Sequence, residues 1–125
     1  MAIWFIRIAV VYLVIGVIGG QIMGITERFA YADVHAHVNL LGWATLALSG
    51  AIYTLYPTAG KNRLAVVHFW LHNIGLPLFA IGLFLLATND QRGLPFAIVG
   101  STSAILGLIA FATNVWLNAK PAVIA

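Results

Sequence analysis

Four long apolar runs dominate the sequence and restrict it to membrane folds. They cover about residues 2–24, 35–56, 64–87 and 94–117. A helix that crosses the ~30 Å hydrocarbon core needs about 20 mostly apolar residues, because it rises ~1.5 Å per residue. The composition agrees, since 62% of the residues are hydrophobic and only 7% are charged, which is too little polar surface for a soluble domain. We therefore predict an all-α integral membrane protein with four transmembrane helices.

The runs are separated by short segments of polar and turn-forming residues, at about residues 26–28, 57–63 and 89–93. Short connections make sequence neighbours run up and down beside each other, so we predict a single four-helix domain, an up-down bundle or arc, over residues 1–125. The first run has an alternative interpretation as a signal peptide. Its apolar core exceeds the ~7 to 15 residues of such peptides, and we interpret it as a retained helix.

The distribution of lysine and arginine predicts the orientation, because these residues are retained on the cytoplasmic side. A cytoplasmic N-terminus places most of them inside, namely Arg7, Lys61, Arg63 and Lys120. Only Arg28 and Arg92 then lie outside. We predict that both termini are cytoplasmic. The net charge of +3 then reflects topology and contact with the lipid bilayer, and the absence of a basic stripe excludes nucleic acid as a partner.

Several classes of chemistry have no support in the sequence. The absence of cysteine excludes disulfides, thiolate metal sites and the covalent attachment of a c-type haem. There is no phosphate-binding glycine loop, no Ser-His-Asp set and no carboxylate within an apolar run. Hydrolytic and nucleotide-driven reactions are therefore poorly supported.

The four histidines are the strongest functional signal, because a strongly polar side chain at membrane depth is costly. His35 and His37 open the second run, and His68 and His72 lie within the third. Neutral imidazole is tolerated in a membrane and is a good ligand for iron or copper. We therefore expect one or more haem b groups as cofactors.

The spacing of the histidines separates them into different sites. His68 and His72 are four residues apart and share a helix face, where they predict either a second site for copper or iron or hydrogen bonds across a helix interface. His35 and His37 are two apart and point in nearly opposite directions, so they cannot bind one iron in the same way. His35 has the alternative role of an interfacial cap.

Depth in the membrane limits which residues can share one haem. In antiparallel helices we estimate that His37 and His72 lie on the order of 20 Å apart along the bundle axis, from the rise per residue. A haem on His37 therefore needs a second axial ligand at its own level. The candidates are Met23, a histidine of another protomer, or no protein ligand.

Small and polar residues at helical spacing predict how the helices pack. Gly16 with Gly20, and Gly100 with Ala104 and Gly107, are typical of close helix contacts in membranes. Asn73 and Asn114 are expected to hydrogen-bond between helices.

The stretch from residue 37 to residue 57, HVNLLGWATLALSGAIYTLYP, resembles the second helix of subunit I in haem-copper oxidases, above all in nitric oxide reductases. In that superfamily a histidine opens this helix as an axial ligand of the low-spin haem b, and an Asn or Gln follows two residues later. The resemblance implies that His37 is a haem ligand and Asn39 its neighbour. The segment VHFWLHNIG is similar to a metal-ligand segment of the same superfamily, which implies a metal role for His68 or His72.

The superfamily's binuclear centre needs a pair of adjacent histidines and a later haem-ligand helix, and this sequence has neither. Subunit I consists of three arcs of four helices, so by analogy this chain corresponds to one arc and is expected to form a homo-oligomer, with a homotrimer favoured. His35 of one protomer and His37 of another would then supply the two ligands of one haem. The expected location is the bacterial inner (cytoplasmic) membrane.

The leading hypothesis is a haem b-binding membrane protein that transfers electrons, or senses or stores haem or a gas, without full oxidase chemistry; its redox partner is open. One alternative is a non-enzymatic membrane module, such as a small transporter or an assembly partner of a respiratory complex. The other is a metalloenzyme with a second metal at His68 and His72.

Overall fold

The computed structural model describes residues 1–121 as helices joined by short turns. The predicted domain 1–125 ends in residues 122–125, which lie outside the described residues. In chain order the elements are α1 (Ala2–Thr26), η1 (Phe29–Tyr31), α2 (Ala32–His37), η2 (Val38–Thr45), α3 (Leu46–Leu55), α4 (Pro57–Gly60), α5 (Arg63–Ala87) and α6 (Gly93–Asn118).

Within residues 1–121, four helical spans are long and apolar enough to cross a membrane, which confirms the predicted all-α architecture with four transmembrane helices. They are Ala2–Thr26, Phe29–Leu55, Arg63–Ala87 and Gly93–Asn118. The second span consists of η1, α2, η2 and α3 in continuous succession, of which η2 is a wider π-helical segment. It begins at Phe29, six residues before the predicted start at residue 35. Glu27 causes the early start, because it adopts a left-handed conformation (φ 54°) that ends α1 and turns the chain back at once.

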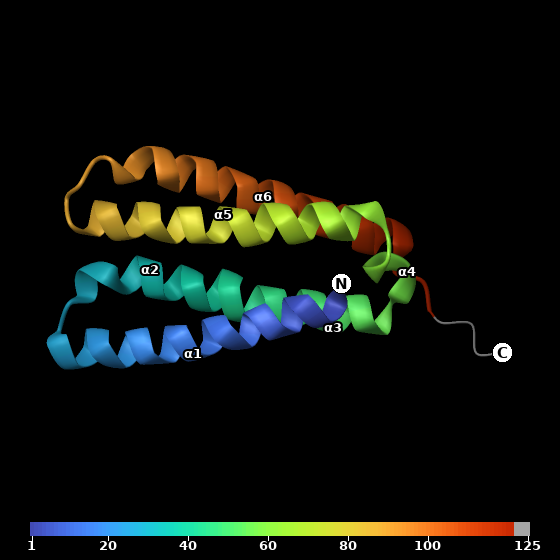
Figure 1. The fold of residues 1–125 in the computed structure, drawn as a ribbon, viewed down its shortest axis with the longest axis horizontal. Helices are drawn as coiled ribbons and strands as arrows, with labels where there is room; N and C mark the ends of the chain where they lie inside the picture. The colour runs from blue at the N-terminus through green and yellow to red at the C-terminus, as the bar shows by residue number, and fades with distance from the viewer. Residues whose placement is uncertain (122–125) are drawn as a thin grey trace.

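The four spans form two helical hairpins, one of α1 with α2 to α3 and one of α5 with α6 (Figure 1). The short helix α4 joins the two hairpins at one end of the bundle, and the α1–η1 and α5–α6 turns lie at the other. We call these the α4 end and the loop end. An even number of spans brings the start of α1 and the end of α6 to the same side of the bundle.

Small residues allow α5 and α6 to pack backbone against backbone. A Cβ atom on Gly75 would lie 2.6 Å from the Ala104 backbone nitrogen, and one on Gly100 would collide with the backbone nitrogen of Phe79. In the other hairpin, Gly16 lies against the Asn39 side chain and Gly20 against the His35 ring. The close contacts predicted at these glycines are confirmed.

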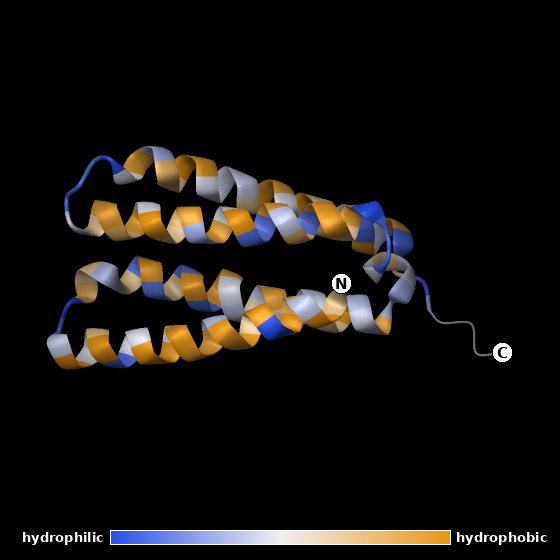
Figure 2. Ribbon diagram, in the orientation of Figure 1, coloured by the Kyte–Doolittle hydropathy of each residue, from blue (hydrophilic) through white to orange (hydrophobic). Residues whose placement is uncertain are grey.

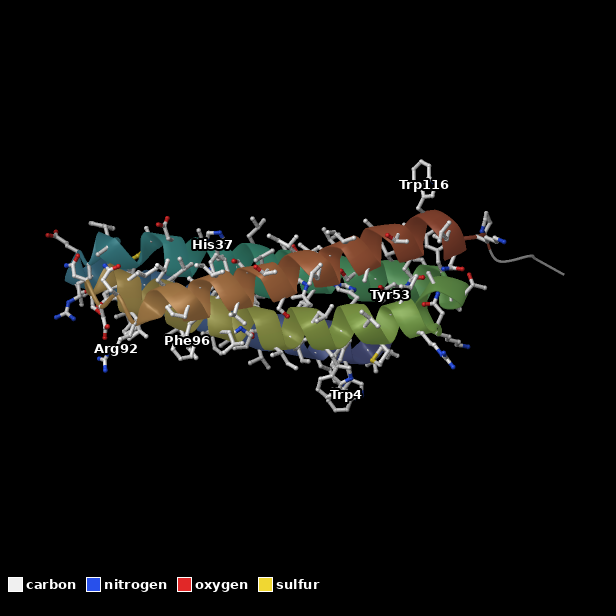
Figure 3. All side chains as sticks on the ribbon, turned by 90° about the horizontal axis from the view of Figure 1, so that it is seen from above. Trp4, His37, Tyr53, Arg92, Phe96 and Trp116 are labelled. Carbon is white, nitrogen blue, oxygen red and sulfur yellow. The ribbon has the colours of Figure 1, made fainter. Side chains whose placement is uncertain are left out.

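Figure 2 shows hydrophobic residues along the length of the helices and hydrophilic residues in the turns at both ends, with further hydrophilic residues inside the helices. Many large hydrophobic side chains are exposed on the described helices. Trp4 and Trp116 project outward from opposite faces (Figure 3), and Trp116 is 89% exposed. Side chains of this size and polarity are exposed without penalty when the surrounding solvent is lipid. The described chain therefore has the surface of a multi-pass membrane protein.

Candidate functional site

Two histidines of α5 lie completely buried between the hairpins. His68 and His72 have no exposed surface, and their rings face each other with centroids 5.4 Å apart. Nε2 of His68 is 3.3 Å from Nδ1 of His72. The prediction that they share one helix face is confirmed, and this face is directed into the bundle.

The two imidazoles are the centre of a longer chain of hydrogen bonds that crosses three helices. At one end, Nε2 of His72 is 3.0 Å from the backbone carbonyl oxygen of Leu41 in η2. At the other end, the hydroxyl of Tyr53 in α3 is 3.1 Å from Nδ1 of His68. The amide nitrogen of Asn114 in α6 is 3.4 Å from the same hydroxyl. We call Tyr53, His68 and His72 the buried relay.

The chemistry of the two end groups fixes the direction of every bond in the buried relay. A carbonyl oxygen only accepts, so Nε2 of His72 carries the proton and Nδ1 of His72 accepts. Nε2 of His68 must then donate to His72, and Nδ1 of His68 accepts from the Tyr53 hydroxyl. The Asn114 amide donates to the hydroxyl oxygen, which is the bond direction that remains. All donors point from Asn114 toward Leu41, and all members are neutral.

This pattern leaves little capacity for a metal at His68 and His72. Each ring uses one nitrogen as a donor and the other as an acceptor, so a metal would have to displace a hydrogen bond. Among residues 1–121 there is no group of three His, Asp or Glu side chains placed to hold a metal ion. The arrangement matches the alternative expected for this pair, which is hydrogen bonding across a helix interface.

Aromatic rings enclose the buried relay. The centroids of Phe5 and Phe111 each lie 4.9 Å from the His68 ring, and the Tyr53 ring makes edge contacts with both phenylalanines. These rings come from α1 and α6, so all four spans contribute to the surroundings. A polar chain inside such an apolar shell is favourable only when its hydrogen bonds are satisfied, as they are here.

Asn114 links the buried relay to the α4 end. Its Oδ1 atom accepts from Nδ2 of Asn62 at 2.6 Å and from Nδ2 of Asn118 at 3.0 Å, and its own Nδ2 donates to the Ala59 carbonyl at 2.9 Å. The bonds to Asn62 and Ala59 confirm that Asn114 bonds across segments. The same prediction was wrong for Asn73, whose side chain donates to the Phe69 carbonyl of its own helix.

His37 lies toward the loop end and faces α5. Its Nδ1 atom is 2.8 Å from the Asp33 carbonyl oxygen, and its ring meets the Phe79 ring edge-on at 4.8 Å. Because a carbonyl only accepts, Nδ1 of His37 carries the proton and Nε2 has a lone pair. This is the common state of a histidine that binds a metal through Nε2.

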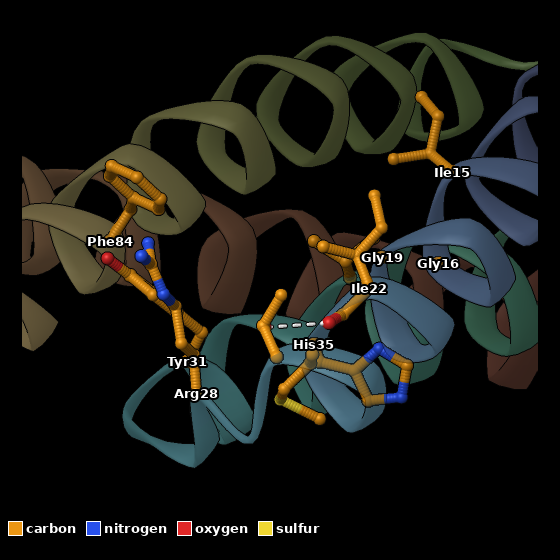
Figure 4. A pocket seen from close by; sticks show the side chains of 11 residues that line it. Ile15, Gly16, Gly19, Ile22, Arg28, Tyr31, His35 and Phe84 are labelled. Atoms are coloured by element: carbon orange, nitrogen blue, oxygen red, sulfur yellow. Dashed lines mark hydrogen bonds between the residues drawn. The ribbon is translucent and has the colours of Figure 1, made fainter.

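His35 points in the opposite direction, toward α1, as the two-residue spacing predicted. Asn39 donates from Nδ2 to Nδ1 of His35 at 3.3 Å, so the His35 proton is on Nε2. His35 lines a cavity of about 350 Å³ between α1, α2 and Phe84 of α5 (Figure 4), and Met23 lines the same cavity. The structure therefore brings Met23 to His35 and not to His37.

The two histidine levels are closer together than the sequence suggested. His37 contacts Phe79, which follows His72 by seven residues on α5, so the axial separation is about 10 Å at 1.5 Å per residue. The expected value of about 20 Å was wrong, because the second span begins at Phe29 and His37 consequently lies deeper in the bundle. Figure 3 shows His37 toward the loop end and Tyr53 toward the α4 end.

Of the residues in the buried relay, Tyr53 was not predicted. The available signal was the polar and small face that His35, Asn39, Ser49 and Tyr53 share on the second span. Comparison of the chain with protein-family models, with curated proteins and with solved structures gave no match.

Proposed function

We propose that this protein binds haem b in the membrane, with His37 as an axial ligand. The observation that carries the proposal is the state of the His37 ring, in which Nδ1 donates to the Asp33 carbonyl and Nε2 has a free lone pair. Among the four histidines, all within residues 1–121, His35, His68 and His72 accept at Nδ1 and carry the proton on Nε2. His37 therefore differs from the other three in the feature that iron ligation requires.

The positions of the candidate ligands allow each chain to supply one axial ligand, His37, to a haem. Met23 lies in the cavity beside His35, on the α1 side of the second span, while His37 faces α5. The second axial position is therefore supplied by a residue of another protomer other than His35, whose Nε2 carries a proton and whose ring faces α1, or it stays open to a small ligand. A homo-oligomer, with a homotrimer favoured by analogy to the three arcs of subunit I in haem-copper oxidases, provides that second protomer.

The chemistry proposed is the one-electron change of haem iron, used to transfer electrons or to sense a diatomic gas. The residues of this chain hold and orient one ligand through the Asp33 carbonyl. The proposal does not include reduction of oxygen or nitric oxide, since the adjacent histidine pair of a binuclear centre is missing. The location proposed is the bacterial inner membrane.

The test is the absorption spectrum of protein purified from cells supplied with a haem precursor. We expect haem b bands after reduction with dithionite, and their loss in His37→Ala. The matched control is His35→Ala, two residues away on the opposite face, which should keep the bands. Protein without extractable haem, or His37→Ala with the full haem content of the wild type, would refute the proposal.

The buried relay favours a second candidate function, that of a membrane module whose inner histidines serve structure or proton binding without haem. In that case His37→Ala leaves any cofactor content unchanged and alters only the association of the chain.

A further inference from the structure

We infer that the buried relay takes up one proton from the α4 end of the bundle and stores it on His72, near the middle of the membrane. This inference does not depend on haem. It rests on the three consecutive hydrogen bonds of the buried relay and on the different chemistry of the groups at its two ends.

The bonds of the buried relay are short enough for proton transfer between neighbours. The two links that transfer a proton measure 3.1 Å from Tyr53 to His68 and 3.3 Å from His68 to His72. The bond of 3.0 Å from His72 to the Leu41 carbonyl ends the chain. A hydroxyl and an imidazole can each accept a proton at one atom while they release another. The relay therefore has the two properties that stepwise transfer requires, an unbroken donor sequence and members that exchange protons.

The proton moves in three steps. A hydronium ion at the α4 end gives a proton to the oxygen of Tyr53, whose own proton passes to Nδ1 of His68. Nε2 of His68 then releases its proton to Nδ1 of His72. The net change is one proton moved from hydronium, which becomes water, to His72, which becomes an imidazolium; no electron moves. Tyr53 and His68 end neutral, with their hydrogen bonds reversed in direction.

The loaded proton has no onward path along this chain. Nε2 of His72 donates to the Leu41 carbonyl in both states, and a carbonyl accepts a hydrogen bond without passing a proton on. That contact stabilises the imidazolium as a charge-assisted hydrogen bond. The relay is therefore a store with one opening, and it does not conduct protons across the membrane.

Entry occurs at Asn114. An amide does not hand on protons, so a water molecule must replace its hydrogen bond to the Tyr53 hydroxyl, which at 3.4 Å is the longest in the series. The half-buried amides of Asn62 and Asn118, which bond to Asn114, connect this point to the polar surface of the α4 end.

The groups that face the two histidines from every packed element are neutral. α1 contributes Phe5, η2 the Leu41 carbonyl, α3 Tyr53, and α6 Phe111. Tyr53 is the titratable group among them. The charge of a stored proton is thus balanced only by oriented dipoles, so His72 holds the proton weakly and releases it when the supply at the α4 end falls.

Nitrogen NMR of ¹⁵N-histidine-labelled protein in lipid nanodiscs tests the inference. The sample is the full chain, reduced so that any bound haem is ferrous. At neutral pH we expect His68 and His72 to carry their protons on Nε2, and on acidification we expect His72 to gain a second proton on Nδ1. Either ring with its proton on Nδ1 at neutral pH, or a His72 that stays neutral on acidification, would overturn the inference.

The second measurement is the rate of proton exchange between His72 and solvent. We expect Tyr53→Phe to slow it by about tenfold or more, which corresponds to about 1.4 kcal/mol of barrier. The control is Tyr12→Phe, because Tyr12 packs on Gly42 in the same hairpin outside the relay. Equal rates in wild type and Tyr53→Phe would contradict the entry route. The neutral-pH spectrum of the wild type tests the relay even where Tyr53→Phe does not fold.

Discussion

Replacing Gly100 with alanine tests how tightly α5 and α6 are packed. A Cβ atom at this position would collide with the backbone nitrogen of Phe79 and lie 2.7 Å from the Gly75 carbonyl oxygen. These are backbone atoms of a rigid helix, so neither contact can be relieved by a side-chain rotation. Overpacking of a well-packed core costs about 1 to 3 kcal/mol, and we expect the upper part of that range. The gain of up to ~1 kcal/mol in helix propensity offsets only part of it.

Two further glycines give graded controls for the same measurement. A Cβ on Gly107 would lie 3.1 Å from the His72 backbone nitrogen, which requires a shift of a few tenths of an ångström, and we expect Gly107→Ala to be nearly neutral. Gly19 has open space at this position, so Gly19→Ala should stabilise its helix by up to ~1 kcal/mol. The assay is unfolding in mixed micelles with increasing SDS, followed by tryptophan fluorescence. The reasoning is refuted if Gly100→Ala unfolds at the same SDS fraction as the wild type.

Three other predictions follow from single contacts. Asn114→Ala should cost about 1 to 3 kcal/mol in the same unfolding assay, because it leaves buried hydrogen-bonding partners unpaired; an unchanged midpoint would contradict the network at the α4 end. In the α5–α6 turn, hydrogen bonds from Arg92 hold the pKa of Asp90 below its ordinary value of 3.8. Any stability from this pair is therefore present above pH ~4 and is lost as the pH falls through the lowered pKa. Asp90→Asn should remove this loss of stability at acidic pH, and an unchanged loss in the variant would contradict the prediction. A proton stored on His72, about 10 Å from the level of His37, should raise the reduction potential of the proposed haem. The Coulomb energy between two unit charges about 10 Å apart, at an effective dielectric constant of ~20, is ~1.7 kcal/mol, which corresponds to roughly 70 mV for one electron. The reduction potential of the wild type should therefore rise as the pH falls and His72 takes up its proton. Potentiometric titration of His72→Gln should show no such rise, and a dependence of the potential on pH equal to that of the wild type would refute the coupling.

The helices and their packing were predictable because hydropathy and glycine spacing are local properties of the sequence. The start of the second span was not, because the charged residues Arg28 and Asp33 interrupt the apolar pattern before residue 35. That error placed His37 too close to the membrane surface and doubled its estimated distance from His72.

The buried relay could be predicted only in part. The helical spacing of His68 and His72 shows that they share a face, but it does not show what that face meets. The contacts with Tyr53 and Leu41 depend on the register between α5 and the second span, which is set by packing and by the π-helical segment η2. Likewise, the tautomer that distinguishes His37 from the other histidines follows from a contact with the Asp33 carbonyl that is visible only once the helix is built.

Chemical rescue of a His37→Gly variant tests haem ligation at His37 most directly, because it separates a ligand from a merely structural side chain. The measurement is the reduced spectrum of this variant with and without added imidazole, beside His35→Gly. We predict that His37→Gly lacks the haem b bands, that imidazole restores them, and that His35→Gly keeps them throughout. Haem b bands in His37→Gly before imidazole is added, equal in intensity to those of the wild type, would contradict the account.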